Sequence, residues 1–216
     1  MPRNVKRQTI VDAATRLFSQ YGYHAVGTDR IIAEAGVAKM TLFRHFPTKK
    51  ELISEVLTQR AQNVLTSISR AIAEKEHPLE RLRALFDWHD RWFKSQEFSG
   101  CMFVSALYEF RSESDEIIRV STDQKLELRL FVQNLLIDLV PQKSTESLAR
   151  KIVMLLDGAT LSAVVGDRKN AANEAWEATE RLISSIRLPL QKTATIDRPT
   201  ALSHIRALNG DELARV

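Results

Sequence analysis

Residues 10–52 read IVDAATRLFSQYGYHAVGTDRIIAEAGVAKMTLFRHFPTKKEL, and this stretch decides the fold of the N-terminal part of the chain. Apolar residues recur in it every three or four positions, which is the period of one face of an α-helix. The predicted helices span residues 7–21, 28–35 and 39–45. Gly22 and Gly36 follow the first two helices, where a left-handed residue ends a helix, and Pro47 follows the third. The stretch therefore predicts three short helices in succession.

The rest of the chain is also predicted to be helical. Thr48 and Glu51 form a capping box, in which each side chain satisfies a backbone N–H at the start of a helix running to about Lys75. Further apolar periodicity predicts helices over residues 78–93, 115–139, 148–165 and 171–187, and a short apolar stretch covers residues 101–110. No segment alternates apolar and polar residues over a length that predicts a sheet. The predicted fold class is therefore all-α.

The predicted organisation has three parts. Residues 1–50 form a three-helix head, and the long helix that follows joins this head to a larger helical body over residues 51–189. Residues 190–216 form a linker and a short helix that ends at Gly210.

Composition limits the cellular setting. The chain has 216 residues and one cysteine, so it forms no intrachain disulfide, and a reducing cytoplasm is the expected compartment. Residues 8–21 are amphipathic instead of continuously apolar, so no signal peptide is expected. Residues 152–165 are too short to span a membrane and are interrupted by Asp157. No membrane partner is therefore expected.

Charge is distributed unevenly along the chain. Residues 1–50 carry nine Lys and Arg against three Asp and Glu, a net charge of +6, whereas the remainder carries 22 against 24, a net charge of −2. This division suggests an N-terminal module that faces a polyanion, with phosphate contacts supplying affinity. An ordinary solvated surface explains the same charges, and charge alone favours that explanation.

The segment Glu34–Val37 lies between two of the short predicted helices. Small Ala35 permits close approach of the helices, Gly36 can adopt positive φ, and Val37 can pack inward. The pattern predicts a helix-turn-helix, although a glycine between two short helices also occurs in proteins that do not bind DNA.

The larger pattern is more specific. It combines I-x-x-A-A-x-x-L-F and YGY at residues 10–23, IA-x-AGV at residues 32–37, and TLFRHF-x-x-K-x-x-L at residues 41–52. This pattern resembles the N-terminal signature of TetR-family transcriptional regulators, and residues 100–109 resemble one of the family's C-terminal subgroups.

The resemblance implies a function. It implies a ligand-responsive DNA-binding transcriptional regulator, a homodimeric repressor that binds double-stranded operator DNA and is released when a small-molecule effector changes the separation of its two heads. It also implies that the protein is not an enzyme.

The predicted helix over residues 39–45 is the second helix of the helix-turn-helix, the recognition helix, and it supplies most candidate DNA-binding residues. Lys39 and Arg44 can donate hydrogen bonds to guanine, and Met40 and the methyl group of Thr41 can contact thymine methyl groups. His45 is expected to contact the DNA backbone.

Three further positions flank these residues or depart from the family pattern. The Thr28 hydroxyl caps a helix whose N-terminus can face a phosphate, although capping alone explains it equally well, and Lys49 begins the next helix within reach of a phosphate. Phe43 stands where the family usually has Tyr, so a hydroxyl contact to phosphate is absent here. Lys39 and Met40 replace a small residue and Gly, so the base preference of relatives does not transfer.

An effector site is predicted in the body. The candidate residues are Trp88, Trp92, Cys101, Phe103 and Tyr108, and their aromatic density is typical of pockets for small apolar or aromatic ligands. The same spacing is more common in helical cores. Cys101 follows a glycine at a helix start, where local N–H dipoles can favour a thiolate that senses oxidants or electrophiles, but a lone cysteine is more often simply buried.

Neither a metal nor a cofactor is expected. Asp87, His89 and Asp90 spread around one helical turn and therefore do not converge on one ion, and His89 on an apolar face is expected to be an interior histidine.

The homodimer is expected to use the last two helices of the body. Ala159, Ala163 and Ala175 permit close helix approach, so a four-helix bundle between subunits, disrupted by charge at Leu156 or Leu182, is predicted.

Two other functions remain open at this point. A helical enzyme with an incidental basic N-terminus is one, but the sequence has no HExxH, phosphate-binding loop, nucleophile elbow or CxxC. An architectural nucleic-acid-binding protein is the other, and such a protein is expected to spread its positive charge more widely.

Overall fold

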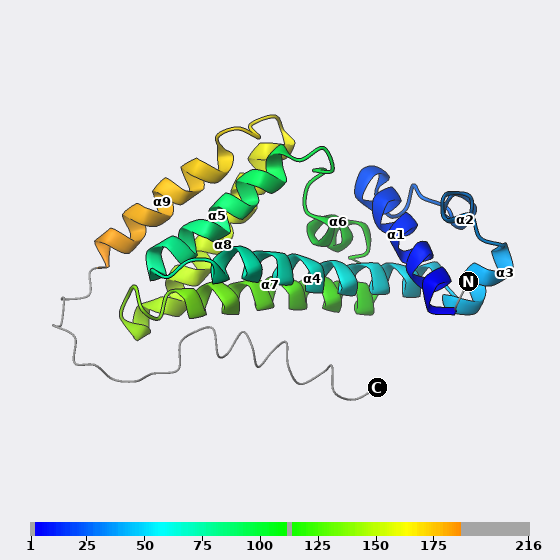
Figure 1. Ribbon diagram of the computed structural model, residues 1–216, viewed down its shortest axis with the longest axis horizontal. Coiled ribbons are helices and arrows are strands. Elements are labelled where there is room, and N and C mark those ends of the chain that lie inside the picture. The colour runs from blue at the N-terminus through cyan, green and yellow to red at the C-terminus, as the bar shows by residue number, and fades with distance from the viewer. Residues whose placement is uncertain (1–2, 112–113, 187–216) are drawn as a thin grey trace. The chain divides into compact units, whose positions relative to one another are not determined.

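The computed structural model describes residues 3–111 and 114–186, and every regular element in these ranges is a helix (Figure 1). The helices are α1 (Arg3–Tyr21), α2 (Thr28–Ala35), α3 (Lys39–His45), α4 (Lys49–Ala73), α5 (Pro78–Lys94), α6 (Met102–Glu109), α7 (Asp115–Leu135), α8 (Gln142–Val164) and α9 (Ala171–Ser185). The predicted all-α fold is confirmed. No helix within the described ranges is both long enough and apolar enough to cross a membrane.

Several helix ends differ from the prediction. Helix α1 begins at Arg3 and not at Arg7, and α8 begins at Gln142, directly after Pro141, and not near residue 148. These added turns are mostly polar, so apolar periodicity gives no signal for them. The predicted linker and helix within residues 190–216 lie outside the described residues.

The turn between α2 and α3 has the predicted geometry. Gly36 has φ 61°, in the left-handed region, and its N–H donates to the carbonyl of Ala33 while the N–H of Val37 donates to that of Ile32. The role expected of Thr28 is corrected: Gly27, with extended backbone, is the N-cap, and Thr28 is already the first residue of α2. No side chain caps this helix start.

The capping box at the start of α4 is present in part. The Glu51 N–H donates to Thr48 Oγ1 over 3.2 Å, and the Thr48 hydroxyl donates to the Glu51 carboxylate over 3.0 Å. The Thr48 side chain therefore caps the helix, and the Glu51 side chain bonds to Thr48.

The described residues form two compact units. The first unit comprises the described residues up to Val64 together with Ser99–Glu127, and the second comprises Leu65–Phe98 together with the described residues from Leu128 onward. The first unit thus contains α6 in addition to the three predicted head helices. The predicted boundary between residues 50 and 51 stays a prediction.

One continuous core holds the first unit together. Its buried side chains come from α1, α2, α3, α4, α6 and α7 and from the residues that follow α1, α3 and α6, and they include Ile10, Phe18, Ile31, Leu42, Phe46, Leu52, Leu57, Phe103, Phe110 and Ile117. Burial of this apolar surface is the main stabilising contribution. At the edge of the core, Arg7 donates to Glu55 over 2.8 Å, and its guanidinium lies 5.0 Å from the centroid of the Phe46 ring.

The second unit is built from α5, α8 and α9, which pack against one another (Figure 1). Phe86 of α5 meets Trp176 of α9 edge to face, with ring centroids 5.4 Å apart. His89 is buried, and its Nδ1 is 2.8 Å from the carbonyl oxygen of Leu85, which confirms the prediction of an interior histidine.

The Arg7–Glu55 pair generates a prediction about stability and pH. The hydrogen bond from Arg7 holds the pKa of Glu55 below its ordinary value of 4.5. The pair therefore stabilises the fold above pH 4.5, and this contribution is lost as the pH falls through the lowered pKa. We expect Glu55→Gln to lower the free energy of unfolding at pH 7 by about 0.5–1 kcal/mol, since the pair is partly exposed.

Urea unfolding at pH 7 and in acid checks this expectation. The matched control is Glu34→Gln, which breaks the more exposed Arg16–Glu34 pair, with side chains 62% and 43% exposed, and is expected to have a smaller effect. A difference between Glu55→Gln and wild type that stays the same in acid would show that the ion pair is not its source.

Candidate functional site

Helices α2 and α3 present one exposed surface because their opposite faces are anchored in the core of the first unit. Ile31 of α2 and Leu42 of α3 are completely buried, and Val37 in the turn packs against the same core. Burial on one side of such short helices fixes which residues face outward.

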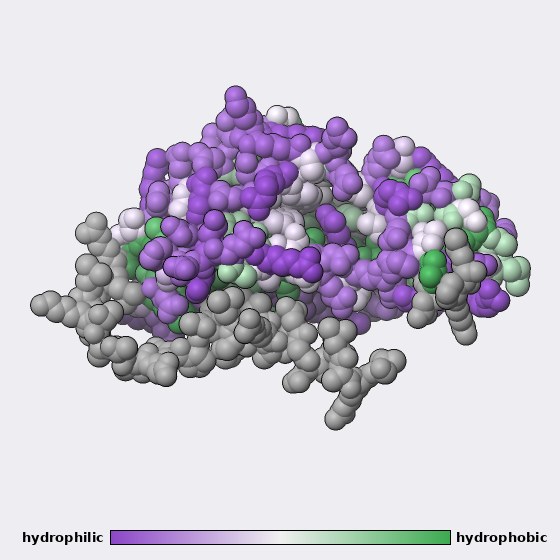
Figure 2. Space-filling model, viewed as in Figure 1, coloured by the Kyte–Doolittle hydropathy of each residue, from purple (hydrophilic) through white to green (hydrophobic). Residues whose placement is uncertain are grey.

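The outward surface of α3 carries three of the predicted DNA-binding residues. Lys39, Met40 and Arg44 are exposed, and the Met40 side chain reaches an exposed fraction of 79%. Figure 2 shows hydrophobic residues, in green, at the end of the view where Figure 1 places α2 and α3. An exposed methionine between two cations can contact apolar groups such as thymine methyl groups.

The other predicted residues of α3 are less accessible. Thr41 is buried, with an exposed fraction of 8%, so little of its side chain remains available for a base contact. Phe43 is half-buried and packs against the core, and His45 is half-buried. The structure therefore brings all six predicted α3 residues into one short helix, but it exposes them unequally.

Thr28 and Lys49 lie at the starts of α2 and α4, and both are half-buried. Burial lowers the pKa of Lys49, and the negative charge of Glu109 partly opposes this change.

Ion pairs reduce the positive charge available for a partner. The Lys39 ammonium is 3.7 Å from the Asp29 carboxylate, Arg16 pairs with Glu34, and Arg7 pairs with Glu55. Arg44 forms no ion pair with a described residue. The sequence analysis did not predict a role for Asp29. Asp29 lies on the first helix of the helix-turn-helix and Lys39 on the second, and their spacing could have indicated this ion pair.

The tryptophans of the predicted effector set lie in the second unit. Trp88 and Trp92 are half-buried on α5, their ring centroids are 5.7 Å apart, and the Trp88 indole N–H donates to Ser67 over 2.9 Å. Phe93 and Phe98 are buried beside Trp92, with centroid distances of 5.6 and 5.0 Å. This aromatic cluster is therefore core on one side and accessible on the other.

The remaining members of that set lie in the first unit. Cys101 is the half-buried N-cap of α6, Phe103 is part of the core, and Tyr108 has an exposed fraction of 76%. The five predicted residues are thus divided between two units, and these three differ widely in accessibility.

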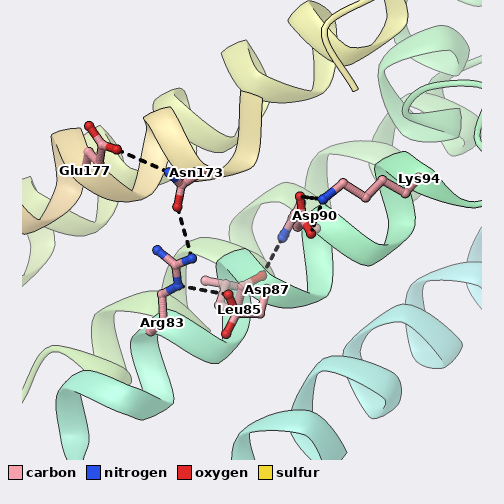
Figure 3. Close-up of polar contacts among 8 residues, drawn as sticks. Arg83, Leu85, Asp87, Asp90, Lys94, Asn173 and Glu177 are labelled. Carbon is pink, nitrogen blue, oxygen red and sulfur yellow. Dashed lines mark hydrogen bonds and ion pairs between the residues drawn. The ribbon is translucent and has the colours of Figure 1, made fainter. Parts of the chain in front are cut away.

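A polar groove between α5 and α9 was not predicted. Its lining combines the buried Phe86 and Ala172 with six charged or polar residues, which are Arg83, Asp87, Asp90, Lys94, Lys169 and Asn173. Figure 3 shows Arg83 extending toward Asn173, to which it donates over 3.0 Å, while it also donates to Asp87 over 2.8 Å. Lys94 pairs with Asp90. Because its lining is mostly charged and polar, the groove does not resemble a site for an apolar ligand.

No group of three or more His, Cys, Asp or Glu residues within the described parts of the chain is arranged to hold a metal ion.

Comparison with known proteins finds a family match within the first unit. A family model described as "Bacterial regulatory proteins, tetR family" matches residues 10–56. The chain is 37% identical over 84 residues to the HTH-type transcriptional activator FasR of Mycolicibacterium smegmatis, covering 39% of this chain and 38% of FasR. It is 35% identical over 82 residues to the uncharacterized HTH-type transcriptional regulator YxaF of Bacillus subtilis, covering 38% of this chain and 43% of that one. The chain therefore matches less than half the length of either relative.

The fold is similar over a longer range. A crystal structure of a TetR-family transcriptional regulator from Streptomyces coelicolor superposes with a TM-score of 0.79 and 27% identity, covering 84% of this chain and 95% of that chain. A TetR-family structure from Agrobacterium tumefaciens has a TM-score of 0.75 at 19% identity, covering 87% of this chain and 100% of that one, and shows the fold alone.

Proposed function

Because the chain belongs to the TetR family of transcriptional regulators, we propose that it is a homodimeric repressor that binds operator DNA through α3 and is released by a small apolar or aromatic effector. The observation that carries the proposal is the exposed surface of α3, where Lys39, Met40 and Arg44 project from a helix that the core holds in place. Such a surface fits the major groove of DNA, whose base edges present acceptors and methyl groups. Because the proposed partner is operator DNA, the expected compartment remains the cytoplasm.

The relatives and the fold are those of transcriptional regulators, not of enzymes. FasR is named an activator, so the direction of regulation needs its own test. A reporter gene behind a selected operator supports repression if expression rises when this protein is removed, and contradicts it if expression falls.

Selection from a pool of random duplexes tests DNA recognition. Two identical heads related by a two-fold axis must contact inverted half-sites, so a near-palindromic operator is expected. A single asymmetric half-site occupied by a monomer would contradict the proposal, and binding without sequence preference would support an architectural protein instead.

The exposed cations of α3 generate a prediction about affinity. We expect Arg44→Ala or Lys39→Ala to weaken binding to the selected operator by about 1–3 kcal/mol if the lost contact is bidentate to a base. Fluorescence anisotropy at a fixed salt concentration measures the effect. Lys169→Ala, which removes an exposed cation from the second unit, is the matched control and should bind as wild type does. Unchanged affinity in both α3 variants would show that another segment contacts the bases.

The proposed dimer surface differs in detail from the sequence prediction. Leu156, Ala159, Ala163 and Ala175 are buried within the single chain, where α8 and α9 pack together, so they are not available to a second subunit. The exposed apolar residues of α8 and the position after it are Met154, Leu161, Val164 and Val165. A row of exposed apolar residues along one helix is typical of a protein–protein interface. We therefore expect a second copy of the chain to cover it.

Two substitutions separate dimerisation from folding. Leu161 is 65% exposed and Leu156 is 1% exposed. We expect Leu161→Glu to give a folded monomer, because the charge falls on the interface, and Leu156→Glu to unfold the second unit, because it buries an unpaired charge. Light scattering and circular dichroism distinguish the two results. A Leu161→Glu variant that remains a stable dimer would place the interface elsewhere.

The proposed effector site lies at Trp88 and Trp92, whose accessible side can accept an aromatic molecule. Release of DNA requires the effector to favour the arrangement that does not bind the operator, and a 100-fold preference corresponds to about 2.7 kcal/mol. A screen of small aromatic compounds for operator release, followed by tryptophan fluorescence, identifies candidates. We expect Trp92→Ala to bind the operator normally but to lose the release. A normal response in this variant would show that Trp92 is only a core residue.

A further inference from the structure

Helix α6 holds the turn between α1 and α2 through one carboxylate. The Tyr23 N–H lies 3.1 and 3.0 Å from the two carboxylate oxygens of Glu109, and the His24 N–H donates to Oε2 over 2.7 Å. These two amides follow the end of α1 and have left its hydrogen-bond ladder. An ionised acceptor makes such bonds stronger than a neutral one does.

Further contacts surround this carboxylate. The Tyr23 ring is completely buried, and its hydroxyl donates to the carbonyl of Met102 over 2.9 Å. His24 lies against the Phe110 ring, with centroids 4.7 Å apart, and its Nε2 is 2.9 Å from the carbonyl oxygen of Glu109. The first and the last residue of α6, Met102 and Glu109, therefore both bond to this turn.

The backbone of the turn is shaped to admit the carboxylate. Gly22 has φ +79°, and a Cβ at this position would lie 3.0 Å from Glu109 Oε1. Only glycine combines this backbone conformation with so close an approach.

We propose that Glu109 is a positioning residue for DNA binding, which acts by clasping the α1–α2 turn. The proposal rests on the proposed function. The turn leads directly into Thr28, the first residue of α2, and α2 packs against α3. Asp29, one residue further on, is 3.7 Å from Lys39. A shift of the turn therefore changes the placement of the surface that contacts DNA.

The test compares full-length variants. Glu109→Gln keeps the size of the side chain but replaces the ionised carboxylate, which accepts from both amides, with a neutral group that has one acceptor oxygen. Glu116→Gln is the matched control, since Glu116 is an exposed glutamate of α7 in the same unit. Hydrogen exchange of residues 22–27, thermal unfolding, and anisotropy with a selected operator are measured for each variant at a temperature well below the unfolding midpoint.

We expect Glu109→Gln to exchange faster only in the α1–α2 turn, to remain folded, and to bind the operator about tenfold more weakly, in proportion to the loss of a charge-assisted hydrogen bond. Unchanged exchange in the turn would show that the clasp does not form in solution. Faster exchange with wild-type affinity would show that the clasp is structural only. Either result overturns the proposal while leaving the proposed function intact, whereas failure of the wild-type protein to select any duplex would overturn both.

If Glu109→Gln fails to fold, Glu109→Asp provides the second variant. It keeps the carboxylate but shortens the side chain by one methylene, which withdraws the acceptor oxygens from the amides of Tyr23 and His24. Weaker operator binding by this folded variant supports the clasp, and wild-type binding contradicts it.

Discussion

A helix of seven residues is not stable in water by itself, because the cost of nucleation exceeds the gain from so few hydrogen bonds. Helix α3 has this length, yet it carries the main DNA-contacting surface that we propose. It persists because Leu42 and Phe46 are buried in a core shared with α1, α2 and α4. The exposed positions of Lys39, Met40 and Arg44 are a consequence of that burial, so the proposed function depends on an apolar contact made on the opposite side of the helix.

The distribution of charge also depends on packing. The sequence assigns a net charge of +6 to residues 1–50, but Arg7 pairs with Glu55, which lies beyond that segment. Lys39 and Arg16 likewise have carboxylate partners within the first unit. Exposed pairs such as these contribute little to stability. The positive charge available to DNA is thus smaller than the total charge of residues 1–50 suggests.

The second unit shows the same distinction between pattern and placement. Periodicity identifies apolar positions on α8, but it does not say whether the same chain or another copy covers them. Leu156 and Ala159 are covered by the chain itself, whereas Met154 and Leu161 are not. In a similar way, the aromatic residues between 88 and 108 form one group in the sequence but belong to two units of the structure.

The sequence by itself determined the all-α fold, the three head helices, the turn at Gly36 and the residues of α3, because helix periodicity, glycine caps and the family signature are local in the chain. Tertiary structure decided which of these residues are exposed, since Thr41 and Met40 are neighbours in the sequence with opposite burial. It also decided that Gly27, and not Thr28, is the N-cap of α2, because a cap depends on backbone angles. The contact between Glu109 and the amides of Tyr23 and His24 joins residues more than eighty positions apart. No local pattern encodes such a contact, because it exists only once α6 has packed against the turn that follows α1.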